Sequence, residues 1–547
     1  MSQPLLSHQL HDEESDEHDD WKDPSTSPKA SSSRKYFCII SGAVGLTLVG
    51  MLMGAFLTPL DHGNECGLQH PVNLTNKPLV RIVKDPLLST QQTTNHTEQQ
   101  QKPRNVIMMI SDGLGPASVS FARTYYQYIN QKPYDYKTPL DSIHVGQSRT
   151  RSSSTLVTDS AAGATAFSCG IKTYNGAVGV DPQGKPCGTV LESAKHHRNM
   201  LTGLVATSRI THATPASWSS HQKDRENEAS IAAQQIGDNP LGRSVDLMFG
   251  GGYCYFLPKS DQQSCRPDER RLFEEAKHNN WTTVLHGDRK AWDELDMDPS
   301  ILPVISLFTS GHMSYEIDRD HTKEPSLTEM SDKALQLLSS ATKETEQGFF
   351  LMIEGSRIDM AAHSNDPATH VHDILEYQNT VALVKKFVDE HPDTIMISTS
   401  DHETGGLSLA RQVSAKYPKY LWYPDVLKGV KRSTAILAGD ILRTNAEDRQ
   451  KVVENQLGIQ DITGDELKKL AKINSAKEMD IYLASMVSIR SQLGWATHGH
   501  SGVDVNLYAY GNSVDEFRGS HENTDIGHIL AQKLDLDMDA ITKELNK

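Results

Sequence analysis

The sequence has no surplus of positive charge and no internal repeat. Its 547 residues contain 54 Lys and Arg against 70 Asp and Glu, for a formal net charge of −16. Because nucleic-acid-binding proteins present basic faces, this balance argues against nucleic acid as a partner. Without a repeat, we expect one large folded domain rather than an array of small units.

One stretch lacks charge altogether, the apolar run Phe37–Leu60. About 20 apolar residues span a bilayer, so residues 36–60 are predicted to form a transmembrane signal-anchor helix. Four cationic residues precede the run: Lys22, Lys29, Arg34 and Lys35. The segment that follows it, residues 61–75, contains no Lys or Arg. The positive-inside rule then places the N-terminus in the cytosol and the rest of the chain in a lumen.

The flanking compositions divide the chain further. Residues 1–35 are polar and acidic, which is typical of a disordered cytosolic tail. Residues 61–103 are predicted to form a lumenal stem, since their second half is a polar linker of low complexity. Residues 104–547 form the folded domain, with helices expected at Asp465–Ile473 and Glu478–Leu493. Three sequons agree with a lumenal location, at Asn73, Asn95 and Asn280.

The segment Val157–Ala166 places Ser160 directly after Asp159 and before a run of small residues. Small residues leave a serine hydroxyl accessible at the start of a helix. The free backbone N–H groups at that end of the helix favour a bound anion. An ordinary helix start with Asp or Ser as the N-cap explains the same pattern. No histidine neighbours Ser160 in the sequence, and a serine nucleophile needs a base or a metal to activate it.

Candidate metal ligands follow three apolar runs that are predicted to be buried strands. The runs are 105–111, 349–353 and 394–400, and they lead into Asp112, Glu354 and Asp401-His402. Asp359 and His363 are four residues apart, on one face of a helix if that segment is helical. Carboxylates and imidazoles suit zinc and magnesium, and two zinc ions about 4 Å apart form the usual clamp for displacement at phosphorus.

The ordered motifs resemble the alkaline phosphatase family over about four-fifths of the chain. They are DGLG, VTDSAAGATA, THATP, EGSRIDMAAH, SDHETGG and HSGVD. With the membrane anchor, the resemblance is to the fungal vacuolar members. It implies an α/β fold, a three-layer sandwich around a mostly parallel sheet. It also implies a homodimer, with residues 417–495 as a helical cap or dimer-facing insertion.

The resemblance assigns site roles by motif. Ser160 matches the nucleophile that becomes phosphoserine, and Arg225 matches the arginine that grips phosphate with two N–H donors. The ligands of two zinc ions are then Asp359, His363 and His500 for the first, and Asp112, Asp401 and His402 for the second. The ligands of one magnesium are Asp112, Thr214 and Glu354. His498 has no counterpart among the ligands of the family motif, so we interpret it as a neighbour of the metal ligands and not as a ligand.

Two positions depart from the family pattern. His212 stands where bacterial members have an acid, and a neutral imidazole is a poor direct ligand for magnesium. His212 is therefore an additional candidate at the magnesium site, with weakened binding expected there. Met360 stands where bacterial members have lysine and animal members histidine, and it cannot donate a hydrogen bond to phosphate.

The implied activity is hydrolysis of phosphate monoesters at alkaline pH to an alcohol and inorganic phosphate. Small monoesters are the expected substrates, with phosphopeptides as a second class, and the vacuole lumen is the expected location. We predict two disulfides, Cys169–Cys187 and Cys254–Cys265, only because the members of each pair are close in the sequence. Two alternatives stay open: a related phosphodiesterase, sulfatase or mutase, and an inactive membrane-anchored interaction module.

Overall fold

A ten-stranded sheet organises the part of the chain that the structure, a computed structural model, describes: residues 102–416 and 419–547. Its strand order is β12-β2-β11-β8-β1-β7-β3-β4-β6-β5. The strands are β1 (Asn105–Ile110), β2 (His144–Arg149), β3 (Leu201–Arg209), β4 (Leu247–Gly251), β5 (Thr283–His286), β6 (Val304–Leu307), β7 (Phe349–Glu354), β8 (Thr394–Thr399), β11 (Val505–Gly511) and β12 (Gly519–Glu522). Among them β11 runs antiparallel to its neighbours β2 and β8. The predicted mostly parallel α/β sheet is confirmed.

The central strands are apolar because both of their faces are covered. In β1, Val106 and Met108 pack into one hydrophobic cluster while Ile107 and Met109 pack into another. All four side chains are fully buried. Successive apolar side chains of the strand thus point to opposite faces of the sheet, and both faces are buried. This pattern is typical of parallel strands that lie between two layers of helices.

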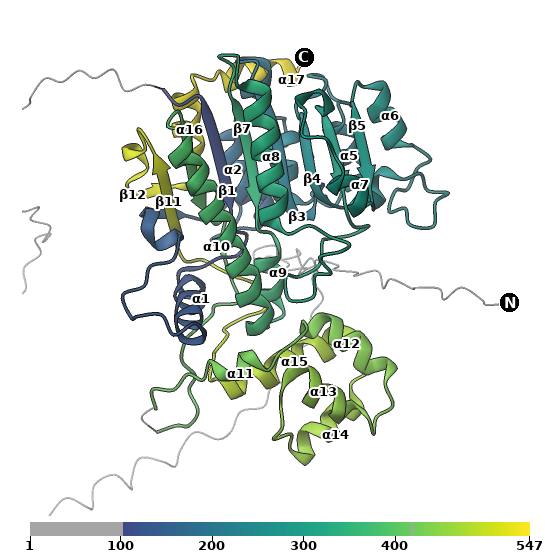
Figure 1. The fold of residues 1–547 in the computed structure, drawn as a ribbon, viewed down its shortest axis with the longest axis vertical. Helices are drawn as coiled ribbons and strands as arrows, with labels where there is room; N and C mark the ends of the chain where they lie inside the picture. The colour runs from purple at the N-terminus through teal and green to yellow at the C-terminus, as the bar shows by residue number, and fades with distance from the viewer. Residues whose placement is uncertain (1–101, 417–418) are drawn as a thin grey trace, which may run out of the picture. The chain divides into compact units, whose positions relative to one another are not determined.

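Helices cover each face of the sheet. Figure 1 shows α8 and α10 lying across the front of it. The helices of this layer are α1 (Pro116–Ile129), α7 (Arg289–Asp293), α8 (Leu327–Thr342), α9 (Arg357–His363) and α10 (Pro367–Glu390). The other layer contains α2 (Ser160–Cys169), α3 (Val190–His196), α4 (Ala213–Ser219), α5 (Glu228–Gln235), α6 (Leu272–His278), α16 (Asn523–Leu534) and α17 (Met538–Leu545).

The region between the motifs SDHETGG and HSGVD is helical. It contains α11 (Asp425–Lys428), α12 (Thr434–Arg443), α13 (Arg449–Leu457), α14 (Gly464–Lys472) and α15 (Ala476–Ser491). These helices lie together below α9 in Figure 1. The two helices expected here are confirmed as α14 and α15, each within two residues of the predicted ends. Whether this region faces a second subunit stays a prediction.

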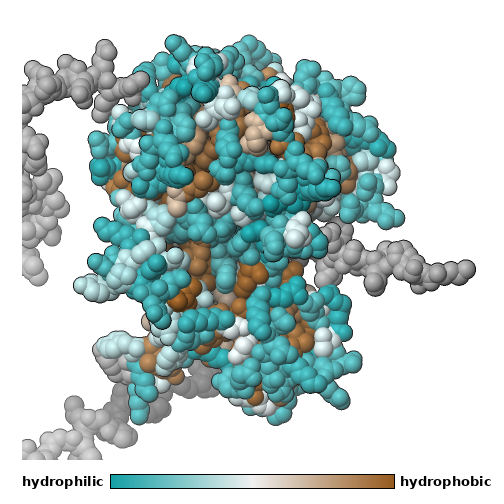
Figure 2. Space-filling model, in the orientation of Figure 1, coloured by the Kyte–Doolittle hydropathy of each residue, from teal (hydrophilic) through white to brown (hydrophobic). Residues whose placement is uncertain are grey.

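Short elements complete the described chain. They are the ribbon of β9 (Glu403–Thr404) with β10 (His500–Ser501), and the 3-10 helices η1 (Leu140–Ile143), η2 (Tyr253–Phe256), η3 (Pro299–Ile301) and η4 (Asp515–Phe517). Disulfides join Cys169 to Cys187 and Cys254 to Cys265, as predicted. The face in Figure 2 is mainly hydrophilic, with apolar groups visible between the hydrophilic ones in both its upper and its lower parts.

Several predictions fall outside the described residues. They concern the tail of residues 1–35, the membrane helix of residues 36–60, nearly all of the stem of residues 61–103, and the sequons at Asn73 and Asn95. Within the described ranges, every helix is too short or too polar to cross a bilayer. Asn280 is exposed just after α6, and its glycosylation stays a prediction.

Candidate active site

Three acids meet at the carboxyl edge of the sheet because their strands are neighbours. Strand β1 lies between β7 and β8, and Ile110 pairs with both Glu354 and Thr399. The residues that follow each strand therefore emerge side by side, as expected for parallel strands. Asp112, Glu354 and Asp401 are all fully buried. The sequence-predicted acids thus form one cluster.

Ser160 begins α2 at this edge. Asp159 is the N-cap, and its Oδ1 accepts a hydrogen bond of 3.0 Å from the Ala162 N–H. The ordinary interpretation as a helix start with an Asp N-cap is therefore confirmed, and the nucleophile role of Ser160 stays a prediction. The small residues have a structural reason: a Cβ on Gly163 would lie 2.9 Å from the Cβ of Asp401. Glycine here lets the helix approach the end of β8.

One candidate metal position lies beside the serine. His402 Nε2 is 3.0 Å from Ser160 Oγ, 3.3 Å from Asp401 Oδ2 and 3.4 Å from Asp112 Oδ1. A single ring nitrogen cannot satisfy three oxygens, whereas a tetrahedral zinc ion holds its ligand atoms about 3.3 Å apart. Burial lowers the pKa of His402 well below its usual value, so the ring is a neutral potential ligand.

A second position lies beside it, at Asp359. His363 Nε2 is 3.3 Å from Asp359 Oδ2, and the Nε2 atoms of His363 and His500 are 3.2 Å apart. Ligand atoms of Asp359, His402 and His500 also lie within 4.8 Å of one another. The rings of His402 and His500 are stacked 3.5 Å apart, so the two positions adjoin. The three residues expected to bind the first zinc are brought together.

A third group contains Asp112, His212 and Glu354. Buried polar atoms here have no hydrogen-bond partner among the described residues: both carboxylate oxygens of Asp112, Glu354 Oε1, Thr214 Oγ1 and His212 Nδ1. Burial raises the pKa of Glu354 to about 7, and burial with carboxylate repulsion raises those of Asp112 and Asp401. Orphaned acceptors and crowded acids are the pattern expected where cations bind.

Arg225 is oriented by two residues that flank it. Its Nη1 donates to Asp159 Oδ2 at 3.2 Å and its Nη2 donates to His212 Nε2 at 2.9 Å. The backbone of Arg225 also donates to Gly176, whose own N–H binds the same Asp159 oxygen. The guanidinium is therefore held in one orientation beside Ser160, as bidentate recognition of phosphate requires.

Sequence reasoning missed several of these contacts. It did not place His402 against Ser160, did not assign Asp159 to Arg225, and did not find His312, whose ring packs on His212 with centroids 5.2 Å apart. The pairs are separated by 66 to 242 positions. No spacing in the sequence indicates these contacts. The position of Asp159 next to Ser160 could have suggested that Asp159 takes part in the site.

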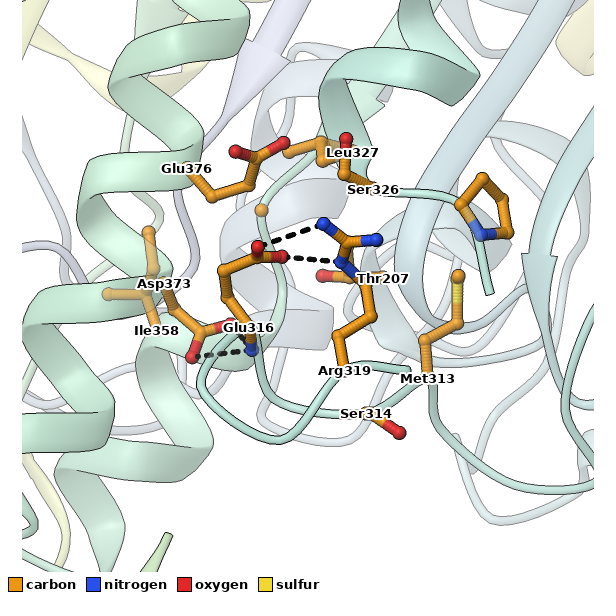
Figure 3. Close-up of a pocket in the computed structure, with 12 residues that line it drawn as sticks. Thr207, Met313, Ser314, Glu316, Arg319, Ser326, Leu327, Ile358, Asp373 and Glu376 are labelled. Atoms are coloured by element: carbon orange, nitrogen blue, oxygen red, sulfur yellow. Dashed lines mark hydrogen bonds and ion pairs between the residues drawn. The ribbon is translucent and has the colours of Figure 1, made fainter. Parts of the chain in front are cut away.

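The small cavity in Figure 3 is distinct from this cluster. It measures about 20 Å³, room for one water molecule. Arg319 pairs with Glu316 through two contacts of 2.8 and 3.0 Å, and the Glu316 N–H lies 3.4 Å from Asp373. None of the grouped metal ligands lines the cavity.

Comparison with known proteins identifies the class. The alkaline phosphatase family model matches residues 103–536, so the chain belongs to the alkaline phosphatase family. It is 47% identical over 452 residues to an alkaline phosphatase of Schizosaccharomyces pombe, covering 81% of this chain and 84% of that protein. It is 45% identical to the repressible alkaline phosphatase of Saccharomyces cerevisiae, covering 81% and 83%.

Solved structures agree with the fold. A cold-active alkaline phosphatase from Shewanella superposes with a TM-score of 0.67 at 32% identity, covering 78% of this chain and 99% of that one. A mutant of the alkaline phosphatase of the Antarctic bacterium TAB5 matches with a TM-score of 0.56 at 27% identity, covering 80% and 100%. In that mutant a histidine is replaced by glutamate, and magnesium is bound in a site called M3. The chain is an enzyme that hydrolyses phosphate monoesters.

Proposed function

We propose that the enzyme works through a phosphoserine at Ser160, with two zinc ions and one magnesium ion. The observation that carries this proposal is the convergence of Ser160 Oγ, Asp112 Oδ1 and Asp401 Oδ2 on His402 Nε2 within 3.4 Å. The residues that would hold zinc are Asp359, His363 and His500 for one ion and Asp112, Asp401 and His402 for the other. When bound, zinc supplies positive charge that favours the serine alkoxide and a departing oxygen.

The chain's own residues supply positioning. Arg225 holds the phosphoryl group with its two N–H donors. Ser160 Oγ attacks phosphorus, so that a new O–P bond forms while the ester O–P bond breaks and the alcohol leaves. Water then attacks the phosphoserine, which releases inorganic phosphate and restores the hydroxyl. The N–H groups at the start of α2 favour the negative charge that builds there.

Metal removal tests this proposal. The purified full-length chain should hydrolyse p-nitrophenyl phosphate at alkaline pH, lose that activity in a chelator, and recover it when zinc is restored. Recovery is expected because the orphaned carboxylates at the edge of the sheet remain in place. Turnover that persists after the metals have been stripped, with metal content measured directly, would contradict the zinc assignment.

We propose that the magnesium site contains Asp112, Thr214 and Glu354, with His212 limiting its affinity. The donors are three oxygens and an imidazole, and magnesium prefers oxygen. The mutant of the TAB5 enzyme, with glutamate in place of histidine and magnesium in its M3 site, supports this reading.

Replacing His212 by Asp should therefore tighten magnesium binding about tenfold or more. Calorimetric titration of the zinc-loaded protein with Mg²⁺ measures it. His196→Asp is the control, because His196 contacts Ser244 outside the site. Equal magnesium affinity in His212→Asp and the wild type would remove His212 from the site.

The setting of the enzyme belongs to the same proposal. We infer a single-pass type II protein of the vacuole membrane, anchored through residues 37–60, with a lumenal catalytic domain that forms a homodimer. Small phosphate monoesters are its substrates and phosphopeptides a second class, with glycans at Asn73, Asn95 and Asn280. The apolar run, the flanking cations, the sequons and the family resemblance support this.

A further inference from the structure

His221 and Glu192 form a buried pair that the mechanism above does not use. The ring Nε2 of His221 is 2.8 Å from Glu192 Oε1, and its Nδ1 is 2.6 Å from the carbonyl oxygen of Gly179. Both partners are acceptors, so both ring nitrogens donate and the imidazole is charged. Burial opposes that charge, but Glu192 and the Gly179 carbonyl raise the pKa of His221 above its usual value.

The carboxylate of Glu192 is held in place by the start of α3. Its Oε2 accepts a hydrogen bond of 3.0 Å from the Thr189 N–H, and Thr189 Oγ1 accepts one of 3.0 Å from the Glu192 N–H. This reciprocal arrangement is a capping box, which fixes both side chains at the end of a helix. Glu192 therefore gives His221 a partner whose position is set by the helix.

A short ribbon of two chain segments carries Arg225. The segments are joined where Val178 and Gln222 exchange backbone hydrogen bonds of 2.9 and 2.8 Å. They are joined again where the Arg225 N–H donates to the Gly176 carbonyl at 2.9 Å. His221 lies on the same segment as Arg225, four positions earlier, and its Nδ1 bonds to the opposite segment. The His221 ring thus ties the far end of the ribbon to α3.

The ribbon is also joined to α2, the helix that begins with the proposed nucleophile. The Gly179 N–H donates to Thr165 Oγ1 at 3.0 Å. At the other end of the ribbon, the Gly176 N–H donates to Asp159 Oδ2 at 2.8 Å. Gly179 has a φ of +57°, and a Cβ there would lie 2.2 Å from the Ser220 carbonyl oxygen, so the segments approach too closely for a side chain. The ribbon therefore has one fixed position against the helix.

We propose that the His221–Glu192 pair is a positioning device for Arg225: it fixes the far end of the ribbon, and so holds the guanidinium where it grips the phosphoryl group. Asp159 and His212 hold the side chain of Arg225, whereas this pair fixes its backbone. Because both ring nitrogens of His221 bond within the protein, it acts as a positioning residue. The inference rests on the proposed function, from which it takes the role of Arg225.

Stabilisation of the fold alone is the competing explanation. On that explanation, losing His221 lowers stability, and any loss of activity is the same whether or not Arg225 is present. Asp246→Asn is the matched control, because Asp246 is a buried acid that pairs with Lys195 of the same helix α3 at 2.7 Å. It removes a buried ion pair of α3 that is separate from the ribbon.

A double-mutant cycle in the metal-loaded full-length enzyme separates the two explanations. His221→Gln keeps an amide that reaches Glu192 but loses the bond to the ribbon. It should lower kcat/KM for p-nitrophenyl phosphate, and weaken inhibition by inorganic phosphate, each by about tenfold, since small displacements of a positioned group are costly. In the Arg225→Ala background the same change should cost less than about twofold, because the positioned group is gone. Asp246→Asn should lower thermal stability alone.

Two further variants sharpen the test. His221→Asn keeps the reach of Nδ1 instead of Nε2, so it serves where His221→Gln does not fold, and the same loss is expected. Glu192→Gln lets a neutral ring keep both hydrogen bonds, so its kcat/KM should stay within about threefold of wild type. Wild-type values in the His221 variants that fold, or an equal loss with and without Arg225, would overturn the proposal.

Failure of the proposed function gives a different result. Phosphate inhibition of wild-type strength in Arg225→Ala alone would show that the grip assigned to Arg225 is wrong, and this inference would fall with it. Weakened inhibition in Arg225→Ala but not in the His221 variants would overturn the inference alone. Inhibition by phosphate measures binding and not the covalent step, so both results are independent of the phosphoserine assignment.

Discussion

Ser160→Ala should reduce hydrolysis of p-nitrophenyl phosphate by at least about 10³-fold, with little loss of stability. Ser160 is the first residue of α2, and the contact recorded for its hydroxyl is the 3.0 Å approach to His402 Nε2. The N-cap of the helix is Asp159, so the helix keeps its cap when the hydroxyl is removed. The chemistry is lost because the hydroxyl that forms the covalent bond to phosphorus in the proposed mechanism is removed.

Ser168 supplies the matched control on the same helix. It is fully buried, and its Oγ donates to the carbonyl of Ser217 at 2.6 Å. Ser168→Ala should lower the free energy of unfolding by about 1 kcal/mol while leaving turnover intact, the reverse of Ser160→Ala. Rapid quenching with substrate followed by mass spectrometry should find phosphate on the Ser160 peptide of the wild type alone. Substantial turnover in Ser160→Ala would void the assigned nucleophile.

Asp112→Asn should have opposite effects on activity and on the stability of the metal-stripped protein. Both oxygens of Asp112 are buried without a hydrogen-bond partner in the described part of the chain. Asp401, Asp359 and Glu354 repel its charge. Removing the charge should raise the free energy of unfolding of the metal-free protein by about 1–2 kcal/mol, as expected when an unpaired buried charge is relieved.

Activity should fall at least about 100-fold in the same variant, since Asp112 lies in two of the three candidate metal groups. Denaturant unfolding in a chelator and phosphatase assays with metals restored measure the two effects. Asp246→Asn is the control, because Asp246 is a buried acid paired with Lys195 at 2.7 Å. Its loss should destabilise the protein. Destabilisation of the metal-free protein by both variants would show that the cluster is not strained by unpaired charge.

The local sequence determined the elements that form the site. Continuous apolar runs predicted β1, β7 and β8, and the acids that follow them lie at one edge because parallel neighbours end together. The small residues after Ser160 predicted a tight helix start, and the structure explains Gly163 by the approach of Asp401. Helices α14 and α15 were expected within two residues of their ends, and the structure begins them at the N-caps Thr463 and Ser475. Such features depend on residues close together in the chain.

Only the tertiary structure decided which side chains face one another. The approach of His402 to Ser160, the clamp of Asp159 and His212 on Arg225, and the burial of Arg357 against Tyr315 all join distant segments. Each depends on how loops from different strand ends pack across the sheet, which no local spacing encodes. The sequence determined the types of chemical group present and the edge at which they gather. The packing of helices on both faces decided their contacts, because side-chain distances of a few ångströms are set by the whole core.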